Sequence, residues 1–467
     1  MTKNSLSKRL MLICLASVFL ISTGFGCQGL SSSQQNALKP ISLEYWTVHD
    51  DVDTIRALIA SYRTTHPQIN VNVRQLQAAE FYPRLVEALA EDKGPDIISV
   101  NNREMRTYLS KLSQMPASVS DVTSYIKKSQ LGSSETVVNT ATIPLVTPLQ
   151  LANEFVPAVK RDVSVGSNIF GLPISLDTMA LFYNKDLLDR AGVPEPPKTW
   201  EEFQAAVKKM TKYDKATGNI IQSGAALGTG NNIPGVDDIL MMLFRQSNVQ
   251  FTSKSTGRVA FNAAPTRVSE PTTAMNVMDF YTDFANSNRD TYAWSDKSPN
   301  ALDAFVNGSV GFFFGYSYHL PVIKARAPQL NFGVLPMLQL NADKPINVAS
   351  YWIQAVPDKS KHKNEAWGVI NFLAHSKATK LYLDRTGRPT ALRTYITAQQ
   401  VQLDLQPFVA QLLIAENWYH GQNYSVALTA IKDMVTQWLQ PVPDPQKILE
   451  YRQGILNNAA RKIDQTL

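Results

Sequence analysis

Residues 41–100 read ISLEYWTVHDDVDTIRALIASYRTTHPQINVNVRQLQAAEFYPRLVEALAEDKGPDIISV. Apolar residues alternate with polar ones at 41–45 and at 69–73, the pattern of half-buried strands, and the last five residues form a third, apolar strand. Between these strands, 52–62 and 81–89 carry apolar residues three and four positions apart, as one face of a helix does. The order β-α-β-α-β predicts a parallel sheet with helices on both faces.

Ligands of such sheets bind at the carboxyl ends of the strands. Trp46, His49 and Asp50 follow the first strand, and Asn101 and Arg103 follow the third, so these five are candidate ligand contacts. Each also has an ordinary interpretation: Trp46 as a core residue, His49 as a surface histidine, and the last two as part of a turn. A guanidinium at Arg103 would favour an anionic ligand.

Composition limits the class of protein. The chain has 467 residues, enough for two or three domains, and 44% hydrophobic with 18% charged residues is ordinary for a globular protein. These values exclude a disordered chain, a coiled coil and a protein with many membrane spans. The net charge of +6 comes from Lys and Arg residues spread along the chain, so we expect no nucleic-acid partner.

The N-terminus has the layout of a secretory signal peptide. Lys3, Lys8 and Arg9 precede an apolar run at 10–21, which is too short to span a bilayer comfortably. We therefore expect residues 1–26 to be removed from the mature protein.

Cys27 would then be the only cysteine of an exported protein, because Cys14 leaves with the leader. A lone cysteine at this place resembles the lipid acceptor of bacterial lipoproteins, and Gly26 before it fits, although Gly24 replaces the usual Leu. We expect a lipidated tether at 27–39 that holds the folded part on the outer face of the cell membrane, in the periplasm if the host has two membranes. The alternatives are an unprocessed anchor and a plain secreted protein.

The later sequence predicts further elements but leaves 110–170 unassigned, because that segment lacks clear periodicity. A capping box at Thr199 and Glu202 marks one helix start. We expect strands or extended segments at 169–175, 179–183, 311–314 and 331–336, helices from 184, 199, 301 and 365, and a mostly helical C-terminal 70 residues.

Residues 173–190, PISLDTMALFYNKDLLDR, resemble the signature of family 1 extracellular solute-binding proteins. The match consists of a Pro-Ile-Ser start, an Ala followed by two apolar residues, Tyr183-Asn184, and a Leu four places on; Arg190 departs from the usual final residue. Further similar pieces lie in order between residues 41 and 393, at 94–98, 304–311 and 352–357.

The resemblance implies an α/β protein of two lobes, each a mainly parallel sheet flanked by helices, with a cleft and hinge between them. Lobe one would comprise 40–176 and 345–393, and lobe two 177–344 and 394–467. It further implies a monomer that captures a carbohydrate, an oligosaccharide or sugar derivative as in maltose-binding-like relatives. The partners would be the permease subunits of an ABC importer and their cytoplasmic ATPase.

The resemblance also adds candidate ligand contacts. Asp177 matches a position where maltose-binding-like relatives have a ligand-binding carboxylate. Tyr318, or else Tyr316, matches an aromatic residue that stacks on the sugar. Other residues that could line the cleft are Trp294, Trp352, Arg388 and Trp418.

Other functions stay open. A secreted enzyme is one alternative, but the chain has no HExxH or GxSxG motif and no Cys/His cluster, so we expect no catalysis, metal or cofactor. A sensor or adhesin lipoprotein with the same fold is another. The ligand could also be ferric iron, suggested by Tyr316, Tyr318 and His319, or a polyamine.

Overall fold

The computed structural model describes residues 30–128, 134–253, 255–264, 267 and 270–467. The predicted signal peptide and Cys27 lie outside these residues. Within the predicted tether, α2 (Ser32–Ala37) is helical, because Ser31 and Gln34 form a capping box that satisfies amides at its start. In the described part of the chain no helix is both long and apolar enough to cross a membrane.

The first sheet contains the unit predicted at residues 41–100. In sheet order its strands are β2 (Ile69–Gln75), β1 (Ile41–Thr47), β3 (Ile97–Asn101), β16 (Trp352–Ala355) and β8 (Leu172–Pro173). The first three run parallel, as predicted, and the two expected helices are present as α3 (Val52–Arg63) and α4 (Ala78–Ala90). Asp51 caps α3 through the Thr54 amide, at 2.8 Å.

The second sheet is built from later segments. In sheet order its strands are β11 (Lys212–Tyr213), β12 (Ile220–Ala225), β13 (Val310–Gly315), β10 (Ala180–Asn184) and β14 (Phe332–Pro336). The strands and helices expected here are confirmed, among them α9 (Trp200–Met210), whose first turn is capped by Thr199. The other longer helices around it are α8 (Lys185–Arg190), α10 (Val236–Gln246), α11 (Thr273–Thr282), α12 (Ala301–Val306), α13 (His319–Arg326), α18 (Tyr424–Trp438) and α19 (Ile448–Asp464).

The first sheet is mainly parallel, as predicted, because β2, β1, β3 and β8 run in one direction and only β16 is reversed. The second sheet is mixed, which corrects the prediction for that lobe: β12, β13 and β14 run in one direction, and β10 and β11 run in the other. β16 runs antiparallel to β3 and to β8, and β10 runs antiparallel to β13 and to β14. Trp352 at the start of β16 pairs with Asn101 at the end of β3, and Ala180 at the start of β10 pairs with Gly315 at the end of β13. β16 and β10 each come directly after a segment that crosses between the lobes. They therefore enter their sheets at the ends where β3 and β13 stop.

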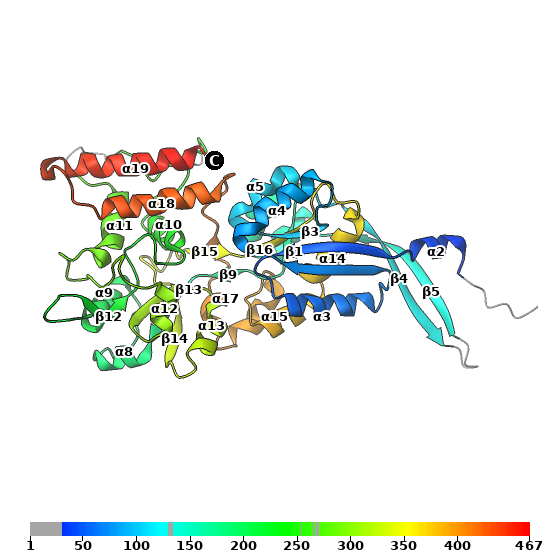
Figure 1. The fold of residues 1–467 in the computed structure, drawn as a ribbon, viewed down its shortest axis with the longest axis horizontal. Helices are drawn as coiled ribbons and strands as arrows, with labels where there is room; N and C mark the ends of the chain where they lie inside the picture. Colours follow the sequence, from blue (N-terminus) through cyan, green and yellow to red (C-terminus); the bar gives the residue numbers. More distant parts are fainter. Residues whose placement is uncertain (1–29, 129–133, 254, 265–266, 268–269) are drawn as a thin grey trace, which may run out of the picture.

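Three short strands lie between the two bodies of the molecule (Figure 1). β9 (Asp177–Thr178) pairs with β15 (Asn347–Ser350), and β15 also pairs with β17 (Ala415–Glu416). Buried apolar residues fall into two cores, one from residues 43–176 and 349–415 and one from 179–348 and 408–463. Residues 396–415 of the segment predicted for lobe two therefore pack largely on the first core.

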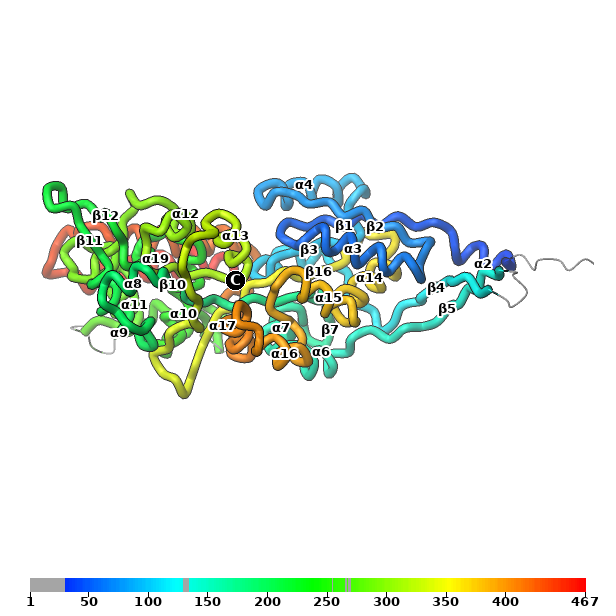
Figure 2. The backbone as a smooth tube through the Cα atoms, turned by 90° about the horizontal axis from the view of Figure 1, so that it is seen from below, coloured from blue at the N-terminus to red at the C-terminus, as the bar shows by residue number. Residues whose placement is uncertain are grey.

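The unassigned segment 110–170 holds a long hairpin. β4 (Ser118–Lys128) and β5 (Ser134–Pro144) pair over eleven residues each, and the hairpin projects from the end of the molecule farthest from the second sheet (Figures 1 and 2). Much of it is exposed, Tyr125 and Ile126 included. Because no face of its outer half is buried, its sequence lacks the apolar-polar alternation that marks a strand. The segment also contains α6 (Pro148–Glu154) and α7 (Pro157–Val163), and α14 (Lys363–His375) and α15 (Lys377–Thr386) complete this lobe.

Candidate ligand-binding cleft

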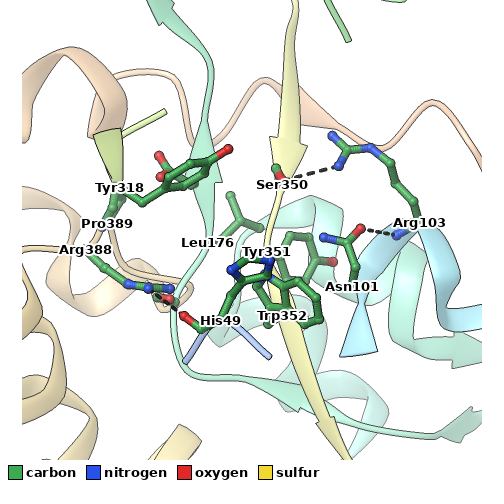
Figure 3. Close-up of a pocket in the computed structure, with 12 residues that line it drawn as sticks. His49, Asn101, Arg103, Leu176, Tyr318, Ser350, Tyr351, Trp352, Arg388 and Pro389 are labelled. Atoms are coloured by element: carbon green, nitrogen blue, oxygen red, sulfur yellow. Dashed lines mark hydrogen bonds between the residues drawn. The ribbon is translucent and has the colours of Figure 1, made fainter. Parts of the chain in front are cut away.

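A cavity of about 290 Å³ lies at the crossing strands (Figure 3). It is enclosed by residues that come from the ends of β1, β3 and β8, from β9 and β15, and from two later loops. The lining residues are His49, Asn101, Arg103, Ser175, Leu176, Asp177, Tyr318, Ser350, Tyr351, Trp352, Arg388 and Pro389.

Aromatic rings form two sides of the cavity. The imidazole of His49 lies against the indole of Trp352, with ring centroids 4.9 Å apart and planes inclined by 52°. Burial, and secondarily the charge of Arg388, lower the pKa of His49, so the ring is neutral at pH 7. Tyr318 stacks on Tyr316 at 5.6 Å and is 45% exposed, which leaves its ring free to contact a ligand. Flat rings of this kind cover the apolar faces of small molecules.

Asp177 places a carboxylate at the first crossing between the lobes. Its Oδ2 accepts a hydrogen bond from Ser317 Oγ at 2.6 Å, and its Oδ1 accepts one from the Thr178 amide at 2.9 Å. Burial raises the pKa of Asp177 to about 6, because the hydrogen bonds of Ser317 and the charge of Arg388 offset only part of the desolvation. The carboxylate is therefore charged at neutral pH and becomes neutral in mild acid.

Arg388 lies in the loop that follows α15 and lines the same cavity (Figure 3). One of its Nη2 protons is donated to the carbonyl oxygen of His49 at 2.8 Å, which holds the guanidinium beside the His49–Trp352 pair. A guanidinium has five N–H donors, so further donors are free for hydroxyl or anionic groups of a ligand.

A buried ion pair crosses from one lobe to the other beside the cavity. Arg103 Nη2 donates to both carboxylate oxygens of Asp238, at 2.7 and 2.6 Å, and each side chain is at most 6% exposed. Tyr316 and Trp418 also donate to Asp238, at 2.5 and 2.9 Å. The Arg103 guanidinium lies 5.7 Å from the ring centre of Tyr424, a cation–π distance.

A second cavity, of about 240 Å³, lies beyond this ion pair and mostly on lobe two. Asp237, Tyr424 and Lys432 give it a polar wall, and Asp237 accepts a hydrogen bond from Tyr424 at 2.8 Å. Burial and the neighbouring charge of Asp238 raise the pKa of Asp237. Both acids follow Gly235, whose positive φ of 72° lets the chain turn into α10.

The hinge region is held by one buried aspartate. Asp162 on α7 accepts hydrogen bonds from the Tyr351 hydroxyl at 2.6 Å and from Asn102 at 3.2 Å. Asn417 and His420, from the segment after β17, donate to its other oxygen at 3.3 and 2.9 Å. This network joins three crossing segments and fixes the strand that presents Trp352 to the cavity.

Seven of the twelve predicted contacts line the first cavity, Tyr316 lines the second, and Trp418 lines neither but donates to Asp238. Those seven are His49, Asn101, Arg103, Asp177, Tyr318, Trp352 and Arg388.

Three predicted contacts do not reach the cleft. Trp46 is a core residue with Arg74 against its ring, and Trp294 is 2% exposed and donates to Asn232 at 3.1 Å. Asp50 turns inward, where it accepts hydrogen bonds from Thr47 and Tyr45, at 2.7 and 3.1 Å. The residues following a strand alternate in direction, so only part of each loop can face the ligand.

Several cleft residues were missed by the sequence reasoning. Ser350 lines the first cavity at the end of β15, and Asp237 and Asp238 line the second cavity. The acidic pair does carry a signal, since it follows a glycine at a helix start. The same pattern is common in ordinary helices, where acids in the first turn complement the helix dipole.

Comparison with known proteins identifies the class. Residues 46–380 match the family described as "Bacterial extracellular solute-binding protein". A solved structure of an ABC transporter solute-binding protein from Thermotoga lettingae, bound with α-D-tagatose, has a TM-score of 0.65 at 19% identity and covers 91% of this chain and 99% of that one.

Relatives by sequence agree with this assignment. The multiple sugar-binding protein of Streptococcus mutans is 21% identical over 371 residues, 78% of each chain. A putative binding protein of Brucella abortus is 27% identical over 211 residues, and the chain spans about half (46%) of that relative's length.

The fold and the cleft thus define a two-lobed solute-binding protein. The chain belongs to the family of bacterial extracellular solute-binding proteins, because the family match covers well over half of it. The resemblance seen at residues 173–190 and the two-lobed α/β fold class are confirmed.

Proposed function

We propose that the chain is the extracytoplasmic binding component of an ABC importer and that it captures a carbohydrate by lobe closure. The observation that carries the proposal is the cavity at the crossing strands, where Trp352 and Tyr318 offer flat apolar rings beside Asp177 and Arg388. Sugars need both features, because their rings have apolar faces and their hydroxyls need strong partners in a dry site. A Streptococcus relative named as a multiple sugar-binding protein supports the ligand class.

Binding would proceed through contacts with both lobes. Lobe one contributes Trp352, His49 and Arg388, lobe two contributes Tyr318, and Asp177 lies on the strand between them. A ligand that touches both sides binds the closed form better than the open form, and it shifts the population toward closure by that difference. The permease subunits would recognise the closed form, and the chain itself would catalyse nothing.

We further propose that the leader at 1–26 is removed and that Cys27 carries the lipid that ties the protein to the outer face of the membrane. The supporting observation is the sequence alone: a basic start, a short apolar run and a lone cysteine.

Contacts in the cleft favour a sugar over the other ligands considered. For ferric iron, Tyr316 donates its hydroxyl proton to Asp238, and His319 Nδ1 accepts the Tyr316 amide proton at 2.9 Å, so both groups are engaged within the protein. For a polyamine, the first cavity offers the single carboxylate of Asp177 beside two cations, Arg103 and Arg388, and Asp238 is already paired with Arg103.

Thermal unfolding of the chain from residue 28 onward tests the ligand class. The panel would hold mono-, di- and oligosaccharides, with ferric iron and spermidine as rival ligands. A ligand at about one hundred times its Kd adds about 2.7 kcal/mol to the folded state and raises the midpoint by a few degrees. We expect a shift with one carbohydrate class.

The matched variants are Trp352→Ala, which removes the ring in the cavity, and Tyr213→Ala, which removes a surface ring on β11, 41% exposed. Only Trp352→Ala should abolish the rise of the unfolding midpoint that the ligand causes. A shift with iron or spermidine and none with sugars would replace the proposed ligand. No shift with any compound would favour a sensor or adhesin that uses the same fold.

A further inference from the structure

The two cavities of the cleft are neighbours that share a boundary. Arg103, Tyr318 and Ser350 line both of them. Of these, Arg103 reaches across the cleft from lobe one to Asp238 on lobe two. The ion pair therefore stands where the first cavity, of about 290 Å³, would continue into the second, of about 240 Å³.

This boundary is rigidly built. Asp238 accepts four hydrogen bonds, two from Arg103 and one each from Tyr316 and Trp418, all between 2.5 and 2.9 Å. Arg103 also donates to Ser350 at 3.3 Å through its other terminal nitrogen. Side chains held by this many contacts do not move aside singly, so the boundary opens only when the lobes separate.

We propose that the Arg103–Asp238 ion pair is a wall that ends the ligand site and restricts this protein to short carbohydrates of one or two rings. The inference rests on the proposed sugar-binding function and names the length of its ligand. A cavity of about 290 Å³ is at the lower end of the sizes that ligand sites have.

Longer sugars are excluded because keeping the two buried charges apart costs free energy. A longer sugar lying across both cavities would leave two buried charges without their partner when the lobes close. Separating such a pair weakens the closed state by about a hundredfold or more, which the few contacts of an added ring do not recover. A short ligand occupies only the first cavity and lets the ion pair form. The lobes therefore close fully on short ligands and not on longer ones.

The second cavity has the chemistry to accept sugar hydroxyls once the wall is gone. Asp237, Asn231, Asn300 and Lys432 line it, along with the ring of Tyr424. Removing the wall should therefore create an extended site rather than an apolar void.

The experiment compares the wild-type chain with the double variant Arg103→Ala/Asp238→Asn. The amide oxygen that replaces one carboxylate oxygen can still accept the hydrogen bond from Trp418, and the amide nitrogen can donate to the Tyr316 hydroxyl, so no charge is left buried alone. The matched control is Lys324→Ala/Asp404→Asn, which removes an exposed ion pair of 2.6 Å. Titration calorimetry would use malto-, cello- and manno-oligosaccharides of one to four rings.

We expect the wild type and the control to bind one- or two-ring sugars and to gain nothing from a third or fourth ring. The double variant should bind the three- and four-ring sugars about tenfold tighter than the wild type does. If the double variant does not fold, Arg103→Gln/Asp238→Asn, which also removes both charges and leaves less space unfilled, should show the same trend.

A wild type that binds a four-ring sugar about tenfold tighter than the two-ring sugar would overturn the proposal. So would a folded variant whose preference for ligand length is unchanged. If the wild type binds no sugar at all, the proposed function fails and the wall has no ligand to limit, an outcome distinct from the other two.

Discussion

Replacing Asp177 with asparagine should change how the stability of this protein depends on pH. The side chain is 9% exposed, and burial raises its pKa from 3.8 to about 6. Since a tenfold change in proton affinity is worth about 1.4 kcal/mol, folding favours the neutral carboxyl over the charged form by about 3 kcal/mol.

The sign follows from the raised pKa. The stabilisation is complete below the unfolded pKa near 3.8 and is lost as the pH rises through about 6. About 2 of the 3 kcal/mol disappear between pH 4.5 and 7.5. The amide introduced by Asp177→Asn would be neutral throughout, although it would lose part of the 2.6 Å hydrogen bond with Ser317. The free energy of unfolding of the variant relative to the wild type should therefore rise by about 2 kcal/mol between these two pH values.

Urea unfolding at pH 4.5 and 7.5, followed by tryptophan fluorescence, measures this difference. Other titrating groups are present in both proteins and cancel in the comparison. Asp189→Asn on the exposed face of α8 is the matched control and should show no comparable change. A relative stability of Asp177→Asn that is the same at both pH values would refute the reasoning, because burial of a charged carboxylate would then not be costly at this site.

Three further predictions concern the cleft and the anchor. Trp352→Ala should weaken sugar binding at least about tenfold in titration calorimetry and leave the unfolding midpoint nearly unchanged, since the ring is only partly buried. A large fall of the unfolding midpoint together with the loss of binding would mean that the ring stabilises the fold. Arg103→Ala and Asp238→Ala should each lower the free energy of unfolding by about 3–5 kcal/mol, and the double variant by clearly less than the sum, as a double-mutant cycle in urea would show; additive losses would mean that the two charges do not interact. Cys27→Ser should move the protein from the membrane fraction to the soluble fraction of cells, and retention in the membrane fraction would argue against lipid attachment at this residue.

Much of the fold was predictable where one face of an element is buried. The strands at 41–45 and 69–73, the helix of α3 and the capped start of α9 follow from local periodicity and caps, which depend on neighbours in the chain. The hairpin of β4 and β5 was not predictable, since it is largely exposed and shows no such period. The reversed directions of β16 and β10 were missed too, because they depend on the end at which the chain enters each lobe.

The candidate site, too, was only partly predictable from the sequence. The sequence by itself determined the family, through the ordered pieces around residues 173–190, and it brought forward seven residues that line the cavity. Only the tertiary structure decided that Trp46 and Asp50 turn into the core, because neighbouring loop residues point in different directions. It alone also joined Arg103 to Asp238, which are 135 residues apart, since a contact between two lobes depends on how they pack and leaves no local pattern in either segment.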